Sequence, residues 1–132
     1  MKRVYVDMVG DLFHIGHINM FKQARELGDY LIVGVHSDKA VESYKRTPIT
    51  PEKGRYEIIR SCRLVDEIIE DAPLIITKKY LLKHDISLVV HGDDIRYDSF
   101  YEVPINMGIM RYVKYTKGVS TTEILNKIKS WN

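Results

Sequence analysis

Residues 3–36, RVYVDMVGDLFHIGHINMFKQARELGDYLIVGVH, contain the pattern that decides the fold. The β-branched run at 3–7 stops just before a glycine and predicts a first strand. Apolar residues at positions 18, 21, 24 and 27 predict a helix over 15–27, which ends at Gly28. The stretch 29–36 is almost continuously apolar, as in a strand buried on both faces of a parallel sheet. This order favours two parallel strands joined by a helical crossover.

The rest of the chain repeats the same alternation. Further strands are predicted at 66–71, 87–94 and 111–116. Further helices are predicted at 37–43, 52–62, 77–85 and 120–131, with a loop at 45–51 and a loop followed by a short helix within 96–108. We therefore predict an α/β fold with a parallel sheet of about five strands and helices on both faces, forming a single domain over 1–132.

Composition excludes several classes of protein. Of the 132 residues, 45% are hydrophobic and 29% are charged, and the net charge of +2 is too small to indicate a nucleic-acid-binding protein. A single cysteine, Cys62, allows no internal disulfide and suits a reducing compartment. The first residues lack the apolar stretch of a signal peptide, so we expect none, and no run of the sequence approaches about 20 apolar residues. We expect a cytoplasmic protein that binds neither nucleic acid nor membranes.

Ligands of parallel α/β sheets bind beyond the carboxyl ends of the strands. This rule brings four segments to one edge of the predicted sheet: 7–17, 36–48, 91–97 and 115–121. Each contains polar residues of a kind that a strand end does not require. The binding site is therefore expected among these segments.

The motif HIGH at 14–17 lies at the start of the first long helix. His14 and His17 can face the same side of a helical turn, where their ring donors would join the backbone N–H groups that favour an anion. Gly16 would let a phosphate approach the backbone closely. This arrangement suits a phosphate whose charge grows in a transition state. The alternative interpretations are a helix cap with a partly buried histidine, or a metal site, for which the motif lacks a third ligand.

The stretch GVSTTEIL at 118–125 begins the last predicted helix. Ser120 and Glu123 have the spacing of a capping box, and Gly118 permits a tight turn before it. The first N–H groups of that helix could hold phosphate. A purely structural cap is the alternative.

The motif HIGH after a first strand, together with GVSTT, resembles the HxGH nucleotidyltransferases, and within them the cytidylyltransferases. The stretches 28–38, 63–73, 88–94 and 118–125 are similar to ethanolamine-phosphate and choline-phosphate cytidylyltransferases, and the short length is similar to glycerol-3-phosphate cytidylyltransferase. The resemblance implies a Rossmann-like fold and an enzyme that transfers CMP from CTP to a small phosphorylated alcohol and releases pyrophosphate. It also implies Mg²⁺ bridging the β- and γ-phosphates and a homodimer.

The same resemblance implies roles for individual residues. The catalytic residues would be His14, His17 and Lys45, with Lys45 clamping both reacting phosphates. The nucleotide would be bound by Val9, Gly10, Gly16, Arg63, Gly92, Asp93, Asp94, Tyr115, Gly118, Ser120 and Thr121. The acceptor phosphate would be bound by Asp7, Lys45, Tyr97 and Tyr101.

Two departures from the family pattern affect the nucleotide site. The chain has Met8-Val9-Gly10-Asp11 where the family usually has Gly-x-Phe-Asp. Tyr115 replaces the arginine of the C-terminal signature, and Lys114, Lys117 or Arg111 would have to compensate for the lost charge. These departures keep open a catalytically inactive nucleotide-binding or regulatory protein, and an ATP-using adenylyltransferase shares the same motif.

The acceptor is indicated by the residues near Asp7. A carboxylate at this strand end suits a cationic head group, and the choline enzymes carry a tryptophan where this chain has Leu74. A quaternary ammonium prefers aromatic walls, so ethanolamine phosphate is favoured over choline phosphate. Glycerol 3-phosphate remains an alternative acceptor.

Overall fold

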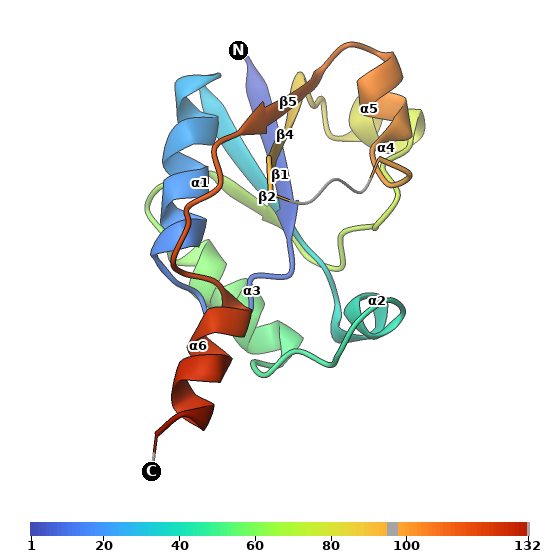
Figure 1. Ribbon diagram of the computed structural model, residues 1–132. Helices are drawn as coiled ribbons and strands as arrows, with labels where there is room; N and C mark the ends of the chain where they lie inside the picture. The colour runs from blue at the N-terminus through green and yellow to red at the C-terminus, as the bar shows by residue number, and fades with distance from the viewer. Residues whose placement is uncertain (95–97, 132) are drawn as a thin grey trace.

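The computed structural model describes residues 1–94 and 98–131, and within them five strands form one sheet in which every pairing is parallel (Figure 1). The order across the sheet is β3-β2-β1-β4-β5. The strands are β1 (Arg3–Met8), β2 (Tyr30–Val35), β3 (Glu67–Ile69), β4 (Leu88–Gly92) and β5 (Met110–Val113). All five were predicted from the sequence, and the parallel α/β fold is confirmed.

Helices pack on both faces of this sheet, also as predicted. They are α1 (Ile15–Glu26), α2 (Asp38–Glu42), α3 (Glu52–Arg60), α4 (Lys78–Lys83), α5 (Glu102–Asn106) and α6 (Thr121–Lys129). The first hydrophobic cluster joins α1 and α3 to one face through Phe21 and Ile59, and the second joins α4 to the other face through Leu81. Figure 1 shows α1 on one side of the strands and α4 and α5 on the opposite side.

Short polar side chains begin three of these helices. The hydroxyl oxygens of Ser37, Thr77 and Ser120 each accept a backbone N–H three residues later, at 3.1 Å. Such bonds satisfy N–H groups that have no partner inside the helix. The cap at Ser120 is the one that the sequence predicts, although the reciprocal half of the capping box from Glu123 is not formed in the described structure.

Alternation along β1 places two kinds of side chain on its two faces. Val4 and Val6 belong to the cluster under α1 and α3, whereas Tyr5 belongs to the cluster under α4. The Tyr5 ring lies across Gly34 of β2, where an added Cβ would be 2.1 Å from the tyrosine oxygen. Asp7, two residues after Tyr5, therefore opens on the α4 and α5 face at the carboxyl end of the strand.

The last helix packs less tightly than the others. None of its residues is fully buried, and in Figure 1 it projects away from the sheet toward the C-terminus. Within the described segments, no helix combines the length and the apolar character that crossing a lipid bilayer requires.

Candidate functional site

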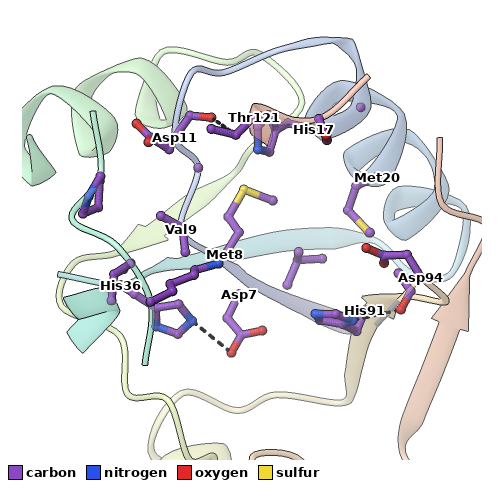
Figure 2. A pocket seen from close by; sticks show the side chains of 18 of the residues that line it. Asp7, Met8, Val9, Asp11, His17, Met20, His36, His91, Asp94 and Thr121 are labelled. Atoms are coloured by element: carbon purple, nitrogen blue, oxygen red, sulfur yellow. Dashed lines mark hydrogen bonds and ion pairs between the residues drawn. The ribbon is translucent and has the colours of Figure 1, made fainter. Parts of the chain in front are cut away.

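A cavity of about 640 Å³ lies beyond the carboxyl ends of the strands. This is the edge at which parallel α/β sheets bind ligands, and the volume is typical of small-molecule sites. Figure 2 shows His17, Asp11 and Thr121 at one end of the cavity and Asp7, His36 and His91 at the other. We call these the phosphate end and the amine end.

The two histidines of the motif HIGH cap the first helix with their own rings. Nδ1 of His14 accepts the backbone N–H of Gly16 at 3.0 Å, and Nδ1 of His17 accepts the backbone N–H of His14 at 3.0 Å. A ring nitrogen that accepts an N–H carries no proton, so each neutral imidazole has its proton on Nε2. Both residues line the cavity. Each ring therefore caps the helix with one nitrogen and keeps the other as a donor.

Burial keeps both rings neutral. It lowers the pKa of His17 from the usual 6.5 to about 4, assisted by the neighbouring His14, and it also lowers the pKa of His14. The ring centroids are 4.0 Å apart, so two positive charges here would repel each other. At neutral pH the pair supplies two N–H donors and no net charge. The cap and the anion site, which the sequence left as alternatives, are compatible functions of the same two rings.

The depressed pKa of His17 predicts a pH-dependent stability. In the unfolded chain His17 takes up a proton as the pH falls through 6.5, whereas in the fold it does so only near 4. The unfolded state therefore binds more protons in this window, and acidification from pH 7 to pH 5 should remove about 2 kcal/mol of stability. Urea titrations at the two pH values should show this slope in the wild type and a smaller one in His17→Asn. Equal slopes in the two proteins would contradict the assignment.

Gly16 makes room for the His14 ring. An added Cβ at this position would lie 2.8 Å from Cε1 and 2.9 Å from Nδ1 of His14. The His14 ring occupies the space that a side chain at position 16 would need, while Gly16 itself lines the cavity. Glycine is required here because the ring must fold back over the helix start to cap it.

Hydrogen bonds from Asp11 and Arg55 hold the loop that follows Lys45. The carboxylate of buried Asp11 accepts the backbone N–H groups of Ile49 and Thr50, both at 2.8 Å, and Nε of Arg55 donates to the carbonyl of Thr50 at 2.9 Å. Lys45 itself lines the cavity mouth, where partial burial and the neighbouring Arg46 lower its pKa. These hydrogen bonds from Asp11 and Arg55 hold the loop in place beside the phosphate end of the cavity.

The start of α6 closes the phosphate end. The Thr121 hydroxyl donates to the backbone carbonyl of Asp11 at 2.9 Å, which joins α6 to the turn before α1. Ser120, Thr121 and Tyr115 all line the cavity. The Tyr115 hydroxyl lies 3.4 Å from the carbonyl of Val119, so Tyr115 braces the turn into α6 but adds no positive charge.

The amine end contains a carboxylate that is only half satisfied. Oδ1 of Asp7 accepts the hydroxyl of Tyr101 at 2.7 Å, while Oδ2 is the one buried side-chain polar atom without a hydrogen-bond partner among the described residues. Burial raises the pKa of Asp7, and the His36 ring and the Tyr101 hydroxyl offset only part of the rise. A cation bound here would relieve the cost of the buried charge.

The structure brings most of the predicted site residues together. Those that line the cavity are Asp7, Val9, Gly10, His14, Gly16, His17, Lys45, Gly92, Asp94, Tyr101, Tyr115, Ser120 and Thr121. Three do not line it. Arg63 is exposed in the turn before β3, Asp93 accepts the N–H of Tyr115 at 2.8 Å, and Gly118 forms the predicted tight turn at φ +85°. Tyr97 lies outside the described residues.

Among the cavity residues that sequence reasoning missed are three with ionisable side chains, Asp11, His36 and His91. All three lie in segments that the strand-end rule had already selected or at their borders. His36 and His91 follow apolar strand residues, and a polar side chain at such a place was an available signal. Within the described part of the chain, no group of three or more His, Cys, Asp or Glu residues is arranged to hold a metal ion.

The sequence matches the family described as cytidylyltransferase-like over residues 10–127. It is 43% identical to the ethanolamine-phosphate cytidylyltransferase of Dictyostelium discoideum, over 96% of this chain and 36% of that protein. It is 38% identical to choline-phosphate cytidylyltransferase A of Homo sapiens, over 96% of this chain and 36% of that protein. The chain thus spans about a third of the length of these relatives.

Solved structures also resemble the fold. The crystal structure of the lipopolysaccharide core biosynthesis protein from Thermoplasma volcanium matches with a TM-score of 0.73 and 27% identity, over 90% of this chain and 99% of that one. A protein of unknown function from Archaeoglobus fulgidus matches with a TM-score of 0.63 and 20% identity, over 91% and 94% of the two chains, which supports the fold alone.

Proposed function

Because this chain belongs to the cytidylyltransferase-like family, we propose that it transfers CMP from CTP to a small phosphorylated amino alcohol, with ethanolamine phosphate favoured, and releases pyrophosphate. The observation that carries the proposal is the pair of neutral histidines whose Nε2–H donors remain available beside a helix start. Such donors are uncharged themselves, and they can stabilise a phosphate whose negative charge grows during the reaction.

The proposed reaction is an in-line displacement at the α-phosphorus of CTP. A phosphate oxygen of the acceptor forms the new bond, and the bond to the β-phosphate breaks, so that pyrophosphate leaves with the electron pair. The acceptor phosphate is already ionised near neutral pH, so no general base is required. Catalysis consists of positioning and charge stabilisation.

The residues at the phosphate end divide this work. His14 and His17 donate to the oxygens of the α-phosphate, where charge develops. Lys45 contacts both the acceptor phosphate and the triphosphate. Ser120 and Thr121, at the start of α6, receive the departing phosphates with their hydroxyl and backbone N–H groups.

Mg²⁺ belongs to this proposal as a partner of the triphosphate. The phosphate end presents imidazole, ammonium and hydroxyl groups, which suit phosphate oxygens better than they suit Mg²⁺. Both oxygens of the Asp11 carboxylate there accept backbone N–H groups, those of Ile49 and Thr50. The ion would therefore be held by the β- and γ-phosphates and by water, as is common for this metal. Bound there, it would offset the charge of the leaving pyrophosphate. A homodimer and a cytoplasmic location also remain predictions.

The names of the relatives support an amino-alcohol phosphate as acceptor, and the half-satisfied carboxylate of Asp7 supports it independently. An ammonium group at the amine end would meet Asp7 while the phosphate of the same molecule extends toward Lys45. Both residues line the same cavity.

The test is pyrophosphate release with Mg²⁺ and either CTP or ATP, against ethanolamine phosphate, choline phosphate and glycerol 3-phosphate. We expect release with CTP and ethanolamine phosphate at a rate well above that of any other pair. Release with ATP alone would replace the proposal by an adenylyltransferase. Binding of CTP without release for any acceptor would indicate a catalytically inactive protein.

A further inference from the structure

A carboxylate oxygen and a ring nitrogen face each other at the amine end of the cavity. Oδ2 of Asp7 lies 3.6 Å from Nε2 of His36, a contact that Figure 2 marks between the two side chains. This separation is too long for a hydrogen bond, and Oδ2 has no other partner among the described residues. The two side chains are only 1% and 7% exposed, so water contributes little to either.

A hydrogen bond to the backbone fixes the orientation of the His36 ring. Its Nδ1 lies 2.9 Å from the backbone carbonyl of Ala72, and a carbonyl can only accept. Nδ1 therefore carries a proton, and in the neutral form of the ring Nε2 presents a lone pair toward the carboxylate. In that form the pair lacks a donor between the two atoms.

Resting on the proposed function, we propose that Asp7 and a neutral His36 bind the ammonium group of the acceptor together, and that His36 makes the site select primary over quaternary ammonium. A primary ammonium can give one N–H to Oδ2 of Asp7 and another to Nε2 of His36. A quaternary ammonium has no N–H and would leave both buried acceptors unpaired. His36 is thus a specificity-determining residue.

Aromatic side chains at the same end do not make this distinction. Tyr44 and Phe100 also line the cavity, with ring centroids 5.8 Å apart in an edge-to-face arrangement. Aromatic faces attract a cation through its charge and need no N–H donor, so they do not select a primary over a quaternary ammonium. Each buried acceptor left unpaired should reduce the efficiency of an acceptor about 10–100-fold. The pair of acceptors, and not the aromatic wall, should therefore decide between the head groups.

The experiment compares ethanolamine phosphate with its N-methyl, N,N-dimethyl and N,N,N-trimethyl forms, the last being choline phosphate. These acceptors carry three, two, one and no N–H groups. In the wild type we expect ethanolamine phosphate and its N-methyl form, which both keep at least two N–H groups, to have similar kcat/KM. The value for choline phosphate should be about 100-fold or more below that for ethanolamine phosphate.

Two substitutions at one position separate the acceptor atom from the packing of the ring. His36→Asn keeps an amide donor near the Nδ1 position for the Ala72 carbonyl but places nothing at Nε2. His36→Gln places an amide oxygen near Nε2. We expect His36→Asn to lower the ethanolamine-to-choline ratio of kcat/KM at least about tenfold, mainly through KM, and His36→Gln to restore most of it.

The outcomes separate this inference from the proposed function. If ethanolamine phosphate is a substrate but the N-methyl series shows no preference, or His36→Asn leaves the ratio unchanged, the inference is wrong and the function stands. If no acceptor is turned over, the function fails, and calorimetric binding of the same series decides the inference. Weaker binding with each lost N–H would support it, and binding without that order, or no binding, would overturn it. If His36→Asn does not fold, the wild-type series alone decides in the same way.

Discussion

Replacing His17 by asparagine is expected to lower kcat for CMP transfer about 10²–10³-fold, with little effect on the stability of the fold. Nδ1 of His17 accepts the backbone N–H of His14, and the asparagine side-chain oxygen occupies nearly the same place. The helix cap is therefore kept. Asparagine has no atom at the position of Nε2, so this substitution removes the donor to the α-phosphate and leaves the helix cap in place.

His17→Ala is the matched comparison because it removes the cap and the donor together. It should show a similar loss of kcat and, in addition, lose about 0.5–2 kcal/mol of stability. Pyrophosphate release at saturating substrates measures the first effect, and thermal melts measure the second. If His17→Asn keeps more than about a tenth of wild-type kcat, the ring donates no transition-state bond and the proposed role is incorrect.

The elements of this fold could be predicted because their signals are local. The apolar run of β2 and the hydroxyl caps at Ser37, Thr77 and Ser120 depend on neighbours only a few residues away. Strand–helix alternation then gives a parallel sheet, and the strand-end rule gives the edge where the cavity lies. The same rule placed most of the candidate residues in one cavity.

The residues that fix the shape of the cavity could not be predicted in this way. Asp11 bonds backbone groups 38 and 39 residues away, and nothing in its own segment indicates that pairing. Arg55 lies in a stretch that reads as an ordinary amphipathic helix, where an arginine is normally exposed, yet its side chain is fully buried. The close contact between Gly16 and the His14 ring also depends on a rotamer of His14 that the sequence does not specify.

The buried arginine gives the second large expected effect. The guanidinium of Arg55 donates to three backbone carbonyls, those of Val9, His36 and Thr50, and to the carboxylate of Asp38. Arg55→Met would fill part of the space but leave these acceptors unpaired. Removing one partner of a buried ion pair typically costs about 3–5 kcal/mol. For a chain of this size, we expect the melting temperature to fall by roughly 10–20 °C.

The same substitution should weaken activity before the protein unfolds. Its four acceptors lie at the ends of β1 and β2, in the Lys45 loop and in α2, so Arg55 joins the segments that form one wall of the cavity. At a temperature where Arg55→Met is still folded, KM for both substrates should rise. Arg60→Met is the control, because Arg60 pairs with Glu57 and Glu70 at the surface and should change neither property appreciably. Equal melting temperatures for the two variants would show that the buried guanidinium does not hold these segments together.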